Sequence, residues 1–99
     1  MMQNNTFPTI TDPFDIPDEN RWIRSFSFKL DTLMRSKHIS NSELESRIGL
    51  SRQAINRYRK GVSIPNAYTI VRLALGIGCT TDALLNMSDV YYQIEHESK

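Results

Sequence analysis

Residues 40 to 61 contain two short amphipathic segments separated by a glycine. Leu44 and Ile48 in the first segment, and Ile55 and Tyr58 in the second, stand three or four residues apart, which is the spacing of one face of an α-helix. The opposite face of the second segment carries hydrogen-bonding side chains: Arg52, Gln53, Asn56 and Arg57. This pattern predicts two helices joined by a tight turn at Gly49, the second with one face buried and the other exposed.

Capping residues mark the ends of both predicted helices. Ser40 is followed three residues later by Glu43, a capping-box pattern in which both side chains satisfy backbone donors, so the first helix is expected to begin directly after Ser40. Gly49 is expected to end it, because glycine adopts the left-handed conformation without steric cost. Ser51 is a second N-cap, and Gly61 closes the second helix. The turn between the helices is therefore short.

Three further helices are expected around this pair. Asp18 is a suitable N-cap for a long helix that comes before the pair. Asn66 and Thr80 are suitable N-caps for two shorter helices that come after the pair. Gly76 and Gly78 are expected to end the fourth helix. Apolar residues at helical spacing supply the core faces of the long helix and of the fourth: Trp22, Ile23, Phe26, Leu30, Leu33 and Met34 in the former, and Ile70, Val71, Leu73, Ala74 and Ile77 in the latter. The predicted fold class is all-α, a compact bundle of about five short helices.

The chain is long enough for one domain of ordinary size. Its 99 residues are 39% hydrophobic, which allows a single small core. Residues 18–87 are assigned to this domain. Residues 1–17 contain three prolines among polar residues without periodicity, and we expect a mobile or loosely docked arm there. Residues 88–99 are expected to form a C-terminal tail or a short helix, which packs on the domain or meets a second copy. Three of its side chains fall on one face: Val90, Tyr91 and Ile94.

Positive charge is concentrated on the two paired helices, although the net charge of the whole chain is only +1. Residues 1–20 carry four acids and no Lys or Arg, whereas residues 21–60 carry ten Lys or Arg against three acids. From Arg47 to Lys60 there are five cations and no acid. A charge run alone is typical of a solvated face. On a helix pair of this spacing, it indicates a surface that neutralises phosphates.

Several other classes of protein lack support in the sequence. There is no run of about 18 apolar residues and no signal-like N-terminus, so we expect no membrane association. Cys79 is the single cysteine and cannot form an internal disulfide, which favours a cytoplasmic location and a packing role for its side chain. His38 and His96 lie far apart without a cysteine or carboxylate at metal-ligand spacing. We therefore expect no enzymatic activity, no metal and no cofactor.

A family resemblance accounts for these features together. From residue 30 to residue 85 the chain resembles the helix-turn-helix domains of lambdoid phage repressors and Cro, the XRE family. The matching positions are the caps, the turn glycine and the core faces: Leu33, Ile39, Ser40, Leu44, Gly49, Ser51, Ile55, Tyr58, Gly61, Pro65, Thr69, Leu73, Ala74, Gly78, Asp82, Ala83, Leu84 and Leu85. Two positions depart from the family pattern. Asn41 stands where glutamine is usual, and Glu45 stands where a small residue such as alanine is usual.

The resemblance implies a DNA-binding site made from the two paired helices. The helix over residues 52–60 is expected to be the recognition helix, which enters the major groove. Four of its side chains are expected to read base edges, because guanidinium groups pair with guanine and amides with adenine: Arg52, Gln53, Asn56 and Arg57. Four others are expected to bind phosphates and fix the register without reading sequence: Ser40, Asn41, Ser51 and Lys60.

The function that the resemblance implies is sequence-specific binding of double-stranded DNA by a transcriptional regulator, with a repressor of the phage or mobile-element type as the first expectation. A single small module contacts few base pairs, so a homodimer on a pseudo-palindromic operator is expected. The alternative is an antitoxin or adaptor whose main partner is another protein, bound through the N-terminal arm or the segment at Tyr91 and Tyr92. Steep salt dependence favours the first, because phosphate contacts weaken with ionic strength.

Overall fold

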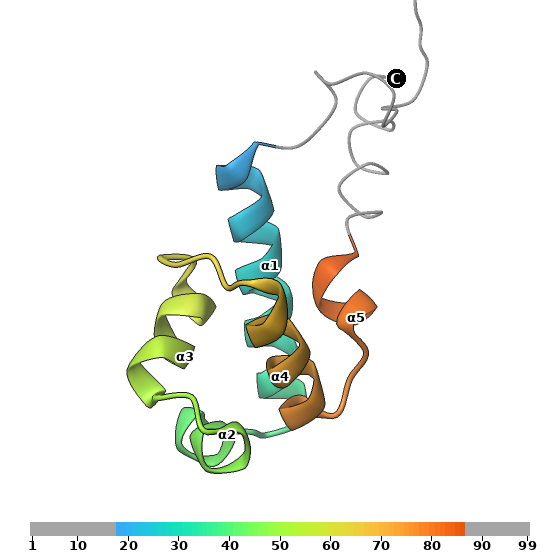
Figure 1. Ribbon diagram of the computed structural model, residues 1–99. Coiled ribbons are helices and arrows are strands. Elements are labelled where there is room, and N and C mark those ends of the chain that lie inside the picture. The colour runs from blue at the N-terminus through green and yellow to red at the C-terminus, as the bar shows by residue number, and fades with distance from the viewer. Residues whose placement is uncertain (1–17, 87–99) are drawn as a thin grey trace, which may run out of the picture.

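The computed structural model describes residues 18–86, and these form five α-helices arranged around one core (Figure 1). The helices are α1 (Glu19–Ser36), α2 (Asn41–Ile48), α3 (Arg52–Lys60), α4 (Ala67–Ile77) and α5 (Thr81–Leu85). Residues 18–86 contain no strand, so the predicted all-α class is confirmed. The expected arm, residues 1–17, and the expected tail, residues 88–99, lie outside the described residues.

Each helix begins where its N-cap predicts. The side-chain oxygen of every cap accepts a hydrogen bond from the backbone N–H three residues later, over 2.7–3.2 Å. The caps are Asp18, Ser40, Ser51, Asn66 and Thr80. The capping box of α2 is only half formed, because the Glu43 carboxylate pairs with Arg47 at 2.7 Å instead of turning back to the cap. Gly49, with a φ of 77°, ends α2 in the left-handed conformation as expected.

The prediction that Gly76 helps to end α4 was wrong, because α4 continues through it to Ile77. A β-carbon at position 76 would stand 2.4 Å from Ile48 Cγ2 and 2.7 Å from Leu44 Cδ1. Glycine is therefore needed inside α4 for close packing against α2, and only Gly78 takes the left-handed conformation that ends the helix, with a φ of 85°.

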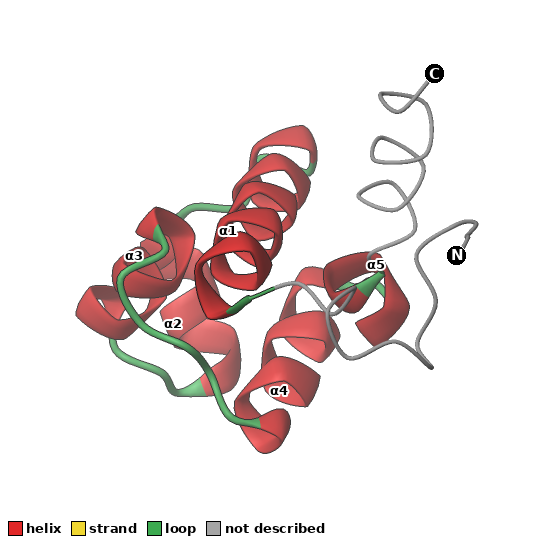
Figure 2. Cartoon of the chain, turned by 90° about the horizontal axis from the view of Figure 1, so that it is seen from above, coloured by secondary structure: helices red, strands yellow, loops and turns green. Residues whose placement is uncertain are grey.

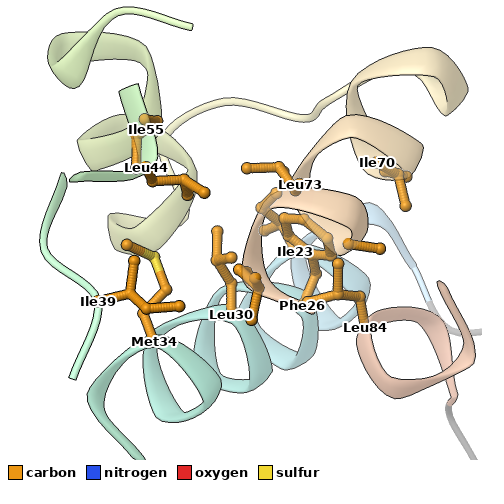
Figure 3. Close-up of a cluster of buried hydrophobic side chains, with 12 residues drawn as sticks. Ile23, Phe26, Leu30, Met34, Ile39, Leu44, Ile55, Ile70, Leu73 and Leu84 are labelled. Carbon is orange, nitrogen blue, oxygen red and sulfur yellow. The ribbon is translucent and has the colours of Figure 1, made fainter. Parts of the chain in front are cut away.

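The core lies between α1 and the other helices (Figure 3). Its fully buried large side chains come from all five helices: Phe26, Leu30 and Met34 of α1, Leu44 of α2, Ile55 of α3, Leu73 of α4 and Leu84 of α5. The prediction that Val71 belongs to this core was wrong. It lies with Tyr68 and Leu75 on the outer face of α4, where the three residues are 43–75% exposed. The spacing of these three is also helical, so periodicity alone did not separate the two faces.

Long basic side chains join the ends of neighbouring helices. Arg47 donates to the carbonyl of Gly76 over 2.8 Å, and Arg72 donates to the carbonyl of Ile48. Lys37, which follows α1, donates to the carbonyl of Gly78 over 2.8 Å. These contacts satisfy carbonyl groups left free at the C-terminal ends of α2 and α4. The two arginine contacts fix α2 against α4, and α2 in turn packs against α3.

No helix formed by residues 18–86 is both long enough and apolar enough to span a lipid bilayer.

Candidate nucleic-acid interface

α3 lies at one side of the bundle, where it packs against both α1 and α2 (Figures 1 and 2). Ile55, on its inner face, is completely buried, and Tyr58 is partly buried against the core. The predicted base-reading residues occupy the other faces: Arg52, Gln53 and Arg57 are exposed, and Asn56 is half-buried. The expected division of this helix into a buried and an exposed face is therefore present.

The start of α2 and the first half of α3 together form a shallow, open depression. It is lined by Asn41 from α2 and by Arg52, Gln53 and Asn56 from α3. One predicted phosphate-binding residue thus stands beside three predicted base-reading residues, although they are distant in sequence. Arg57 is separate from them and lines a second hollow further along α3, with Ala54, Tyr58 and Ser63.

The other predicted phosphate-binding residues lie at the ends of α2 and α3. Ser40 and Ser51 are exposed at the N-terminal ends of α2 and α3, and Lys60 is exposed in the last turn of α3. Each serine hydroxyl accepts a backbone hydrogen bond as an N-cap, over 3.0 and 3.1 Å respectively. The hydroxyl proton of a capping serine remains available for donation to an anion. Both helix N-termini also carry the positive end of the helix dipole.

Glu45, the unusual acid in α2, pairs with Arg52 of α3. Arg52 Nε and Glu45 Oε1 are 3.0 Å apart, and the two side chains are 63% and 39% exposed. The glutamate therefore neither disrupts the approach of the two helices nor faces solvent without a cation. The carboxylate is instead paired with Arg52, a side chain that is predicted to read a base.

Arg59 makes the contacts that join α3 to both neighbouring helices, a role the sequence did not reveal. Its Nε donates to Asp31 Oδ1 of α1 over 2.9 Å, and its Nη1 donates to Asn41 Oδ1 of α2 over 2.6 Å. The side chain is only 16% exposed. Since Arg59 takes the amide oxygen of Asn41, the amide nitrogen is the group left to donate to a phosphate. The partners are 28 and 18 residues away, so no local pattern indicates them.

Ion pairing reduces the free positive charge on this surface. Of the five cations from Arg47 to Lys60, Arg47 pairs with Glu43, Arg52 with Glu45 and Arg59 with Asp31. Within residues 18–86, Arg57 and Lys60 form no ion pair with an acid. The count of five cations from Arg47 to Lys60 thus overstates the charge available for phosphates. Three of these cations are balanced by acids outside the run, which are Glu43 and Glu45 in α2 and Asp31 in α1.

Asp31 accepts hydrogen bonds from two arginines, Arg59 and Arg35, the latter over 2.6 Å. The hydrogen bond from Arg35 is the largest cause holding the pKa of Asp31 below its ordinary value, and the hydrogen bond and charge of Arg59 act in the same direction. Partial burial opposes them by raising the pKa, but the net shift is downward.

We expect acid to weaken the fold through Asp31. Since the folded-state pKa is depressed, its contribution is complete above the unfolded-state pKa of about 3.9 and is lost as the pH falls through the lower folded-state pKa. Asp31→Asn should therefore unfold more easily than the wild type at about pH 6, and the difference should shrink toward about pH 2. Urea denaturation at a series of pH values measures this difference. Parallel stability curves for the two proteins would show that Asp31 has no such role.

Comparison with known proteins identifies the family of this fold. A family model described as helix-turn-helix matches residues 30–84, more than half of the chain. The chain belongs to the XRE-type helix-turn-helix family. In this helix-turn-helix domain the motif comprises α2, the turn at Gly49 and α3, and the family is one of DNA-binding regulatory domains.

A solved structure shares the fold. The crystal structure of NHTF, a hypothetical transcription factor from Neisseria, superposes with a TM-score of 0.65 at 19% sequence identity, and the match covers 90% of this chain and 97% of that one. No curated protein matches the sequence significantly.

Proposed function

We propose that this helix-turn-helix protein binds double-stranded DNA at specific sequences as a transcriptional regulator, with α3 as the recognition helix. The observation that carries this proposal is the exposed polar face of α3, where Arg52, Gln53 and Asn56 line one depression with Asn41 of α2. Ile55 anchors the opposite face in the core, so the polar face can enter a groove without loss of packing. The major groove, about 12 Å wide, admits an α-helix in this way.

The arrangement supports different roles for the two helices: α3 contacts bases, and the N-terminal end of α2 contacts a phosphate. Arg52 donates to guanine, and Gln53 and Asn56 have amides suited to adenine. The N-terminal end of α2, with Ser40 and Asn41, meets a phosphate beside the groove, while Ser51 and Lys60 bind phosphates near the two ends of α3. Arg57 lies further along α3 and reads a base or binds a phosphate. Phosphate contacts set the register, and base contacts then select the sequence.

We further propose that two copies act together as a repressor. One module of this size contacts few base pairs, and a homodimer on a pseudo-palindromic site places two recognition helices in successive major grooves, about 34 Å apart. Joining the two binding events raises the affinity without any new contact. Occupancy of such a site within a promoter blocks access of the polymerase, which is the simplest way for a DNA-binding domain to repress.

Salt titration of DNA binding tests the proposed function. Fluorescence anisotropy with a labelled duplex should give an affinity that falls steeply with salt, and Lys60→Gln should reduce the magnitude of the logarithmic slope by about 1. Lys29→Gln is the matched control, because Lys29 lies on the side of α1 opposite Ser27 and Asp31, which face α3, and should leave the slope unchanged. Absence of duplex binding even in dilute buffer would contradict the proposal and favour a protein partner.

A further inference from the structure

We propose that Glu45 determines specificity by holding the guanidinium of Arg52 in the orientation that reads guanine. This inference deepens the proposed function and rests on it. The carboxylate Oε1 of Glu45 lies 3.0 Å from Arg52 Nε, so α2 supplies an acid to the first residue of α3. Glu45 touches no base in this arrangement. It is a positioning residue that acts through Arg52.

Glu45 approaches Arg52 most closely at Nε, which leaves the terminal N–H groups of Arg52 available for a base. A guanidinium group carries five N–H donors, of which Nε holds one and the two terminal nitrogens hold the rest. The ion pair has its closest approach at Nε, and the two terminal nitrogens together form a fork of donors. That fork matches the O6 and N7 acceptors of guanine in the major groove. Within residues 18–86, neither of these two nitrogens donates a hydrogen bond to the protein that would compete with a base.

The pair also restricts a side chain that would otherwise be mobile. Arg52 is 63% exposed and has many rotamers open to it in water. Binding a base in one geometry costs the entropy of those rotamers, and a contact that already favours that geometry lowers the cost. The benefit is confined to sites that place guanine opposite Arg52, because only there is the fork used. Glu45 thus increases the preference for sites with guanine opposite Arg52 over other sequences.

The same carboxylate opposes binding in general. A negative charge beside a DNA-binding depression repels phosphates at every sequence, so Glu45 lowers affinity for unrelated DNA while it favours the correct site. Its contribution to folding is small, since an exposed ion pair stabilises a protein only weakly. Removing Glu45 therefore separates a DNA-reading role from a structural one: the fold persists, specificity falls and non-specific affinity rises.

The test compares the full chain with Glu45→Ala and Glu45→Gln. Selection from random duplexes gives the preferred site, and dissociation constants are then measured for that site, for the same site with the guanine opposite Arg52 replaced, and for an unrelated duplex. In Glu45→Ala, discrimination at that guanine should fall about tenfold, within the range of one bidentate contact. Affinity for the unrelated duplex should rise severalfold in low salt. Glu45→Gln keeps the size of the side chain but loses the charge of the ion pair, so discrimination should fall and non-specific affinity should rise in the same direction as in Glu45→Ala.

Two controls assign the effect to Arg52. In an Arg52→Ala background, Glu45→Ala should cause no further loss of discrimination. Glu43→Ala removes a similarly exposed acid of α2 that pairs with Arg47 instead, and it should leave discrimination unchanged. Thermal unfolding should show all variants folded.

The outcomes separate this inference from the function on which it rests. A wild-type protein that prefers a site, together with unchanged discrimination in Glu45→Ala, overturns the role of Glu45 and leaves the proposed function intact. An equal loss of discrimination when Arg52 is already alanine overturns it as well. A wild-type protein without any sequence preference overturns both.

Discussion

Gly76→Ala is expected to lower the free energy of unfolding by about 1–3 kcal/mol, which is the usual cost of forcing an extra carbon into a packed core. The added β-carbon would meet Ile48 Cγ2 at 2.4 Å and Leu44 Cδ1 at 2.7 Å. The Ile48 methyl is attached directly to its β-carbon and cannot swing away easily within a helix. Relief of the clash therefore requires α2 and α4 to move apart, and α3 loses support as a result. Urea denaturation followed by circular dichroism measures the change.

This expectation is opposite in sign to the one from helix propensity. Alanine inside a helix is normally more stable than glycine by up to about 1 kcal/mol. Stabilisation by Gly76→Ala would therefore contradict the close packing described here. Ser46→Ala, at an exposed position of α2, serves as the control for propensity alone and should raise the free energy of unfolding slightly, by less than about 1 kcal/mol. The double variant with Ile48→Ala removes the nearer of the two clashing methyl groups, so Gly76→Ala should cost less in that background than in the wild type.

Arg52→Ala is expected to weaken binding to the preferred site by about 1–3 kcal/mol, or roughly 5- to 150-fold, because a base-reading side chain is lost. Binding to an unrelated duplex should change much less, since the terminal nitrogens of Arg52 have no guanine to bind there. Competition experiments with the two duplexes measure both effects in one assay.

Lys60→Ala provides the contrasting case for this prediction. Lys60 is exposed in the last turn of α3 and is proposed to bind a phosphate, so its loss should weaken binding to both duplexes by a similar factor. If Arg52→Ala also weakened both duplexes equally, Arg52 would be a phosphate contact, and base reading would have to come from Gln53, Asn56 or Arg57.

The features of the fold that were predictable from the sequence depend on residues close to one another in the chain. Each helix start depends on one side chain and a backbone N–H three residues away, and the left-handed turn after α2 depends on one glycine, so Ser40, Ser51 and Gly49 could be interpreted from their immediate neighbours. The buried and exposed faces of α3 follow from spacing in the same way. Ile55 falls on one face and Gln53 on the other whatever surrounds the helix.

Contacts between distant parts of the chain were not predictable in this way. Gly76 resembles a helix terminator until α2 is placed against it, and Val71 resembles a core residue until the core is seen to lie on the other side of α4. The links from Arg59 to Asp31 and Asn41 depend on three helices meeting at one point. The sequence marks Glu45 as unusual at its position, but only the structure identifies Arg52 as its partner.

The most direct measurement of the central claim replaces single guanines of the selected site by 7-deazaguanine, which removes the N7 acceptor from the major groove. If Arg52 at the start of α3 reads guanine there, one substitution in each half-site should weaken binding of the wild-type protein by about tenfold. The same substitution should have no further effect on Arg52→Ala. Unchanged binding of the wild type at every guanine, or equal losses in both proteins, would contradict the placement of Arg52 against a base edge in the major groove.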